Sequence, residues 1–277
     1  MTISESDASL KAIEAVERRV LPAVLIKGSR ETSTLEEALA QHNVPAVSIA
    51  VISGGRLQWA RAYGAAHAGG EPVNTRTLFQ SCSISKTIAT VTALRLVDQR
   101  LLDLDRDVNE LLTSWRVPDN PYTKGNPVTT RHLLSHRAGV NVGGFPGYEP
   151  DGPIPTLGQI LRGEPPCNTE ALRVDAEPGR AFRYSGGGMQ ILQQLLEDVS
   201  GIPYAKLATR EVLNPAGMTR STFEPSPTGV AAGHDLSGQI MVRSFAILPE
   251  LAAAGLWSTP SDLARFAVAV QDSYAEG

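Results

Sequence analysis

The chain has 277 residues, of which 42% are hydrophobic and 19% charged, and its formal net charge is −4. These values fit a soluble globular protein with a sizeable core, and the acidic balance argues against a nucleic-acid surface. The polar start lacks a signal peptide's features, and no apolar stretch approaches the roughly 18 residues that cross a bilayer. We therefore expect a cytoplasmic protein with neither nucleic acid nor membrane as a partner.

The N-terminal part predicts two helices followed by a hairpin. Apolar residues recur at helical spacing over residues 9–25, and a second, shorter helix is expected over 34–42 with Ser33 or Thr34 as its cap. Beyond Pro45, two segments rich in β-branched or alternating residues flank Ser53-Gly54-Gly55. We therefore place a β-hairpin within residues 43–64.

The most informative stretch is residues 79–86. From Ser83 onward the apolar spacing is helical, and eight consecutive positions, 87–94, carry no charge, so this helix should run through the interior and end near Arg100. Lys86 opens it, where the helix dipole and the apolar surroundings both disfavour an ammonium ion. Ser83 lies one turn earlier on the same face, so hydroxyl and amine can meet as serine acylation requires.

Most chains contain a serine three residues before a lysine by chance, so the residues next to Ser83 are alternative candidates for the nucleophile. Ser81 and Ser85 do not stand in that relation to Lys86. Cys82 should point away from the lysine, and we expect it to be a small buried side chain rather than a nucleophile. Neither Cys82 nor Cys167 belongs to a disulfide or zinc pattern.

The middle of the chain is expected to be rich in loops. Three short helices are predicted, at residues 108–112, 131–136 and 156–162, and an irregular loop near a pocket mouth at 142–155. His132 and His136 have a metal-ligand spacing, but Leu133 stands where a zinc peptidase has glutamate and no third ligand is evident. We therefore predict no metal site, and assign both histidines to packing and backbone hydrogen bonding.

A second motif, Phe-Arg-Tyr-Ser-Gly-Gly-Gly-Met at residues 182–189, precedes a well-patterned helix that Gly201 and Pro203 end. Glycines before a helix can bind phosphate, but Met189-Gln190 stands where the Walker pattern needs Lys-Ser/Thr. A dinucleotide pattern of spaced glycines is also missing. We therefore expect no nucleotide and no other cofactor.

These motifs resemble those of the serine β-lactamase and penicillin-binding protein superfamily, in its class C-like esterase and peptidase branch. The similar segments are 79–86, 101–105, 132–136, 217–219 and 254–263. The family's Ser-x-x-Lys motif is present at Ser83 to Lys86, and its Tyr-x-Asn motif is matched in part by Tyr184-Ser185-Gly186. The resemblance implies an α+β (α/β) fold, in which helices flank an antiparallel sheet and a second part is largely helical.

The resemblance also implies roles for these residues. Ser83 would be the nucleophile, while Lys86 and Tyr184 share the base role and Tyr184 passes a proton to the leaving group. Which of the two holds the proton at rest stays open. Ser185 and Gly186 would contact the substrate, although the family often has an asparagine at the position of Gly186, whose amide contact is here lost or supplied elsewhere.

The family continues with a strand that bears Lys-Thr-Gly or His-x-Gly, and no such motif follows residue 263. We therefore expect a single domain over residues 1–277, with its first hairpin at 43–64 and a mainly helical part at 83–270. It should be truncated at its C-terminus relative to the family, with an incomplete sheet and one of two oxyanion amides missing.

Three functions remain open. The leading one is a serine hydrolase that forms an acyl-enzyme on a small-molecule ester, amide or peptide; whether β-lactams are among its substrates is left undecided. The second is a non-catalytic relic or binding subunit of the same fold. The third is half of an enzyme completed by self-association or a second chain. A Ser-His-Asp hydrolase is disfavoured, because the chain has no Gly-x-Ser-x-Gly elbow.

Overall fold

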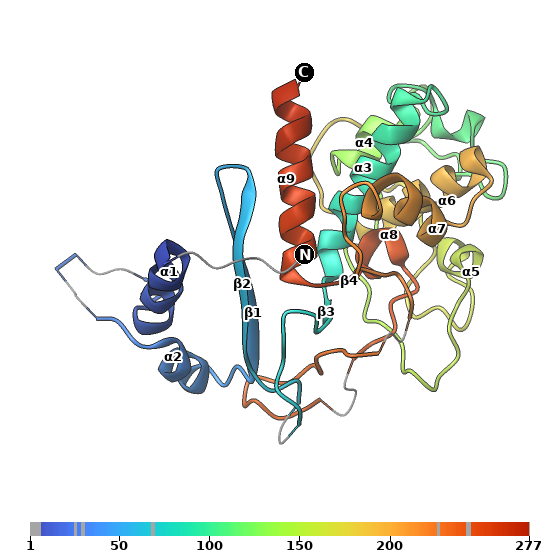
Figure 1. Ribbon diagram of the computed structural model, residues 1–277. Coiled ribbons are helices and arrows are strands. Elements are labelled where there is room, and N and C mark those ends of the chain that lie inside the picture. The colour runs from blue at the N-terminus through green and yellow to red at the C-terminus, as the bar shows by residue number, and fades with distance from the viewer. Residues whose placement is uncertain are drawn as a thin grey trace. The chain divides into compact units, whose positions relative to one another are not determined.

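The protein is described by a computed structural model that divides into two compact units (Figure 1). The described residues are 7–24, 27–28, 31–67, 70–225, 228–241 and 245–276. The first unit comprises residues 1–79, 229–245 and 259–277, and the second comprises 80–228 and 246–258. All residues predicted for the functional site belong to the second unit.

The first unit contains the predicted hairpin. β1 (Ala46–Ser53) pairs antiparallel with β2 (Arg56–Gly64), and the turn glycines Gly54 and Gly55 have φ values of 58° and 68°. Positive φ at both central positions is the backbone of a type I′ turn, which suits the twist of a hairpin. The helix α9 (Pro260–Glu276) packs against both strands. The predicted hairpin is therefore confirmed.

Two helices precede the hairpin. α2 (Leu35–Gln41) begins with a capping box, in which Thr34 Oγ1 accepts from Glu37 N at 3.2 Å and the Glu37 carboxylate accepts from Thr34 N at 2.8 Å. Of the two predicted cap residues, Ser33 and Thr34, Thr34 is therefore the cap. α1 (Asp7–Arg18) stops earlier than predicted, because Val20 exchanges backbone hydrogen bonds with Ser33. The predicted end at Leu25 lies outside the described residues.

The second unit is mainly helical. Its helices are α3 (Ser85–Asp98), α4 (Thr130–Leu134), α5 (Leu157–Arg162), α6 (Gly186–Ser200), α7 (Tyr204–Ala208) and α8 (Leu251–Ala254), with 3-10 turns at Cys82–Ile84 and Val108–Glu110 and a π turn at Thr209–Leu213. A short pair, β3 (Phe79–Gln80) and β4 (Trp257–Ser258), forms the other two-stranded sheet. None of the helices in the described ranges has the length and apolar character that a bilayer crossing demands.

α3 and α6 pack with α8 to form the core of this unit. Ile88, Ala89, Ala93 and Leu96 of α3 are fully buried, as the uncharged run predicted. Each large apolar side chain removed from water in this way contributes about 1.5–3 kcal/mol to stability. Of Leu94 and Leu96, which both fit the helical spacing of this face, Leu96 is the buried one, whereas Leu94 is 40% exposed.

α6 begins earlier than predicted. Gly186, Gly187 and Gly188 form its first turn rather than a loop before it, and Ser185 is the N-cap. A Cβ atom at Gly187 would lie 2.8 Å from Asn141 O and 2.9 Å from Leu172 Cδ2. Glycine therefore lets the loop at Asn141 approach the helix backbone closely, which is a packing requirement that propensity does not reveal.

We predict that Gly187→Ala destabilises the second unit by about 1–3 kcal/mol, because the added methyl group overlaps a backbone carbonyl. Gly188→Ala is the matched control, since a Cβ there meets its nearest atom, Ser185 Oγ, at an ordinary 3.6 Å. That variant should be neutral or stabilising by roughly 0.5–1 kcal/mol. Urea unfolding followed by circular dichroism measures both; equal midpoints would contradict the close approach at Gly187.

Candidate active site

The structure brings three of the predicted residues together around one oxygen atom. Lys86 Nζ donates to Ser83 Oγ at 3.0 Å, and the Tyr184 hydroxyl donates to the same atom at 2.8 Å. Lys86 is buried, whereas Ser83 is exposed and Tyr184 is 43% exposed. The oxygen therefore faces solvent on one side and two groups that can transfer protons on the other.

The turn that carries Ser83 is fastened to a distant part of the unit. Ser85 Oγ donates to Cys82 O at 2.6 Å and accepts from Leu256 N at 2.9 Å. Ser81 N donates to Leu256 O, also at 2.9 Å. Both polar groups of the Leu256 backbone thus bind the turn, which fixes the position of the serine relative to the segment after α8.

α8 also positions the lysine. Lys86 Nζ donates to Ala253 O at 2.7 Å, and it lies 4.9 Å from the centroid of the Tyr184 ring. The buried Lys86 Nζ therefore has a backbone carbonyl on one side and the serine and the aromatic ring on the other. Sequence reasoning missed Ala253, because a backbone carbonyl carries no residue-type signal.

The environment of Tyr184 favours its ionised form. Burial alone would raise the pKa of this phenol, but hydrogen bonds with Lys86 and Ser83, together with the positive charge of Lys86, outweigh it. The pKa of Tyr184 is consequently lower than usual. The phenolate, which is the form that can take a proton from Ser83, is therefore more accessible near neutral pH than in a tyrosine in water.

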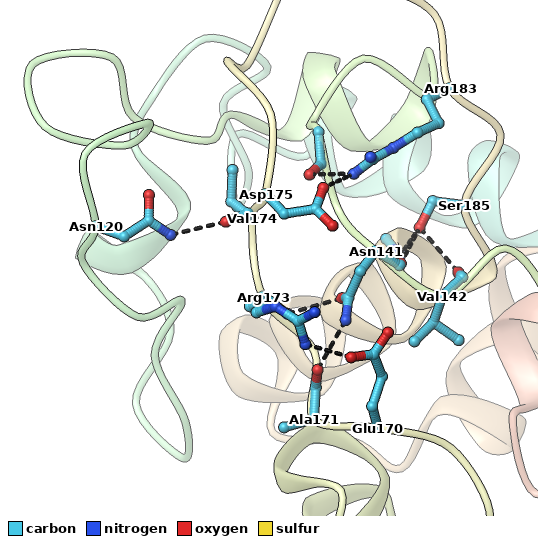
Figure 2. A network of polar contacts seen from close by, with 12 residues as sticks. Asn120, Asn141, Val142, Glu170, Ala171, Arg173, Val174, Asp175, Arg183 and Ser185 are labelled. Atoms are coloured by element: carbon cyan, nitrogen blue, oxygen red, sulfur yellow. Dashed lines mark hydrogen bonds and ion pairs between the residues drawn. The ribbon is translucent and has the colours of Figure 1, made fainter.

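A polar network anchors the segment on either side of Tyr184 (Figure 2). Ser185 Oγ donates to Asn141 O at 3.0 Å, and the Arg183 guanidinium forms an ion pair with Asp175 and donates to Gly139 O at 2.6 Å. Asn141 is in turn held by its own amide side chain, which donates to Ala171 O and accepts from Arg173 N, both at 2.9 Å. The loop at 139–142 thereby fixes the approach of the tyrosine.

Ser185 and Gly186, predicted to contact the substrate, have internal roles. Ser185 is 3% exposed, and its hydroxyl also accepts from Gly188 N at 2.9 Å as the cap of α6. Gly186 N donates to Gly143 O at 3.0 Å, and a Cβ at Gly186 would lie 2.9 Å from Phe145 Cε2. Substrate contact by these two residues stays a prediction.

The prediction that Cys82 is a buried filler is wrong. Its backbone has a φ of 41°, in the left-handed region at the turn before α3, and the residue is exposed. The neighbouring Ile84 belongs to the 3-10 turn rather than to α3, and it is 41% exposed. Both side chains therefore lie at the surface next to Ser83.

His132 and the glycines at the start of α6 form hydrogen bonds within the protein. His132 Nδ1 accepts from Thr129 N at the start of α4, and the amides of Gly186 and Gly187 donate to Gly143 O and Val142 O. Among the described residues, no group of three or more His, Cys, Asp or Glu side chains could hold a metal ion.

The chain contains one match to the letters of the third family motif, at a different place from the family's. The letters His-x-Gly occur at His67-Ala68-Gly69, before Ser83 rather than after it. Ala68 and Gly69 lie outside the described residues.

The serine–lysine–tyrosine geometry and the α+β fold define a protein of the serine β-lactamase and penicillin-binding protein class. The family model named Beta-lactamase matches residues 32–276, so the chain belongs to that family. The chain is 25% identical over 234 residues to the D-alanyl-D-alanine-carboxypeptidase/endopeptidase AmpH of Escherichia coli, and the match covers 79% of this chain and 56% of AmpH. It spans about half the length of the curated relatives it matches.

Solved structures show the same fold. The octameric penicillin-binding protein homologue from Pyrococcus abyssi matches with a TM-score of 0.69 and 27% identity, over 84% of this chain and 54% of the homologue. EstCE1, described as a hydrolase with promiscuous acyltransferase activity, matches with a TM-score of 0.68 and 25% identity, over 83% of this chain and 68% of EstCE1. At the level of the family, these relatives are serine hydrolases, and the predicted fold class is confirmed.

Glu250, the residue before α8, is a further ionisable group of this unit. It is fully buried, and within the described ranges neither carboxyl oxygen has a hydrogen-bond partner from another residue. Burial raises the pKa of Glu250 to about 7, partly offset by its own backbone amide. The Glu250 carboxyl group therefore titrates near neutrality, at the N-terminal end of α8, the helix whose Ala253 carbonyl accepts a hydrogen bond from Lys86.

We predict that Tyr184 ionises before the buried tyrosines as the pH rises. The pKa of Tyr63 is raised to about 12, chiefly by burial and by its bond to Glu17, and burial also raises the pKa values of Tyr148 and Tyr204. Tyrosinate absorbance measured against pH should lose an early step in Tyr184→Phe. In Lys86→Met the same step should move to higher pH, because both a hydrogen bond and a positive charge are removed. An unchanged onset in Lys86→Met would contradict the coupling.

We also predict that Glu250→Gln stabilises the protein above pH 7. A raised carboxyl pKa means that the folded state binds the proton more tightly, so its contribution to stability falls as the pH rises from the usual value of 4.5 to about 7. Glutamine does not titrate, so the free energy of unfolding of the variant should exceed that of the wild type by up to about 3 kcal/mol above pH 7. Below pH 4.5 the two proteins should differ little. Urea unfolding at several pH values measures the difference, with the exposed Glu36→Gln as control. A gain that does not depend on pH would contradict this account.

Proposed function

We propose that the protein is a serine hydrolase in which Ser83 is acylated by an ester or amide. The observation that carries this proposal is the position of Ser83 Oγ, 3.0 Å from Lys86 Nζ and 2.8 Å from the Tyr184 oxygen, at the solvent-exposed start of a buried helix. A hydroxyl becomes an effective nucleophile when a positioned base can take its proton within hydrogen-bond distance.

In the proposed reaction, Ser83 Oγ attacks the carbonyl carbon of the substrate while its proton passes to Lys86 or Tyr184. The carbonyl π electrons move to the oxygen, giving a tetrahedral oxyanion. When the intermediate collapses, the bond to the leaving group breaks and Tyr184 returns a proton to that group. Water then attacks the acyl-enzyme by the same route, releasing the acid and restoring Ser83.

Several features of the second unit support these roles. Ala253 O holds Lys86 against the serine, so little reorganisation is needed at the moment of proton transfer. Ser83 lies in the turn that opens α3, where backbone amides have no intrahelical acceptor. We assign one donor to the oxyanion, the amide of Ser83, in keeping with the use of helix starts to stabilise negative charge.

For the substrate, we propose a small ester, amide or peptide with an apolar group near its carbonyl. Two large apolar side chains near the site are exposed: Ile84, next to Ser83, is 41% exposed, and Phe182, two residues before Tyr184, is 70% exposed. The names of the relatives, a carboxypeptidase/endopeptidase and a hydrolase with acyltransferase activity, are in keeping with acyl transfer. Self-association stays a prediction; the Pyrococcus abyssi homologue is octameric. The cytoplasmic location also stays a prediction.

We predict that a fluorophosphonate or penicillin probe forms a covalent adduct on Ser83, detected by intact mass and peptide mapping. Ser83→Ala should abolish the adduct. Lys86→Met and Tyr184→Phe should each slow its formation by about 10²–10⁴-fold, because each removes a group placed to transfer the proton.

The matched control is Cys82→Ser, since Cys82 carries an exposed free thiol adjacent to Ser83. This variant should form the adduct at the wild-type rate. An adduct on Cys82, or none on Ser83 in the wild-type protein, would overturn the proposal and favour a binding role without chemistry.

A further inference from the structure

His136 makes contacts on both sides of Tyr184 as well as with its ring. Arg183 N, just before the tyrosine, donates to His136 O at 2.8 Å, and Ser185 N, just after it, donates to His136 Nδ1 at 3.3 Å. The His136 and Tyr184 ring centroids are 4.6 Å apart with an interplanar angle of 39°. His136 therefore holds the backbone on both sides of Tyr184 and also contacts the phenol ring.

These contacts matter because Tyr184 is not held by burial. Its side chain is 43% exposed, so packing restricts its ring less than it restricts the core residues of α6. Phe182, which lies at 5.9 Å from the His136 ring in a T-shaped contact, is itself 70% exposed. The half-buried imidazole is thus a main contact that can keep the phenol oxygen at 2.8 Å from Ser83.

We propose that His136 is the positioning residue of this site, and that it acts as a neutral imidazole whose unprotonated Nδ1 accepts the Ser185 amide. The proposal assigns a residue within the acylation proposed above and therefore rests on it. His136 does not touch the reacting atoms; it acts through Tyr184. Its role is to limit the motion of the phenol, because small displacements of a proton-transfer group slow catalysis strongly.

The protonation state follows from donor and acceptor chemistry. A backbone N–H can only donate, so Nδ1 must be the acceptor and a neutral ring carries its proton on Nε2. Burial, and then the positive charge of Lys86, lower the pKa of His136, which favours the neutral ring. The charged neighbour Arg183 is directed away, to Asp175 and Gly139 O. Protonation of Nδ1 would make it a donor that faces the Ser185 N–H, which is also a donor. It would also add a positive charge near Lys86.

The backbone of His136 limits what can replace it. Its φ is 55°, in the left-handed region, which histidine, asparagine and aspartate adopt more readily than other side chains do. Asparagine tolerates this conformation and can place its Oδ1 near the position of Nδ1. Phenylalanine keeps the aromatic ring but has no acceptor. The pair H136N and H136F therefore separates the hydrogen bond from the ring contact.

The test compares the rate of Ser83 acylation by the fluorophosphonate probe in the two variants, with the half-saturating probe concentration measured separately. H136F should acylate at least about tenfold more slowly than H136N, because a backbone donor loses its partner only in H136F. Half-saturation should be unchanged in both. Equal rates in the two variants, or a change confined to half-saturation, would overturn the proposal.

His132 provides the matched control, since its Nδ1 accepts a backbone amide in the same way, from Thr129, without contacting Tyr184. H132F should acylate at the wild-type rate, with unfolding midpoints recorded for all variants. A loss in H132F equal to that in H136F would show that a histidine change within α4 has the same effect as one just after it, and would overturn the proposal.

A second measurement does not depend on activity. Two-bond ¹H–¹⁵N spectra of the histidines, with H136N used to assign the signal, should show Nδ1 of His136 unprotonated and Nε2 protonated at neutral pH. If wild-type protein forms no adduct, the proposed function fails while this spectrum still tests the placement of His136. A protonated Nδ1 would overturn the proposal even if the adduct forms.

Discussion

The proposed active site depends on one constraint: Ser83 Oγ must stay within hydrogen-bond distance of a lysine three residues away and a tyrosine 101 residues away. The first distance is nearly guaranteed by helix geometry, since residues i and i+3 share a face. The second distance joins residues far apart in the sequence. It depends on the polar contacts that the loop at 139–142 and His136 make with the residues on either side of Tyr184. The two partners are accordingly held by different kinds of interaction.

Lys86 is held mainly by the packed core. α3 and α8 pack together, so Ala253 O reaches the amine as a consequence of apolar burial, which is strong and non-directional. Tyr184 is held by directional bonds, from the loop at 139–142 and from His136. Buried polar networks specify one geometry only when every member is satisfied, so the tyrosine side of the site is more sensitive to single substitutions.

This difference explains what the sequence could predict. Local signals were sufficient for the hairpin turn at Gly54-Gly55, for the cap at Thr34 and for the Ser83–Lys86 pair, because each depends on residues a few positions apart. The carbonyl of Ala253 and Nδ1 of His136 could not be assigned, since their roles arise from contacts between distant segments. Tyr184 was found through the family motif rather than through any physical pattern around it.

The glycine at position 186 shows how a local departure from the family can be tied to its surroundings. The resemblance indicates an asparagine there, and its absence could be taken as a simple loss of an amide. However, a Cβ at Gly186 would lie 2.9 Å from Phe145 Cε2 and 3.1 Å from Gly143 O. The Phe145 ring thus occupies space that a side chain at 186 would need, and Gly186 N is bonded to Gly143 O. Asparagine at 186 would therefore require Phe145 to move, so the residues at positions 145 and 186 are coupled and the effect of restoring the amide depends on the ring at 145.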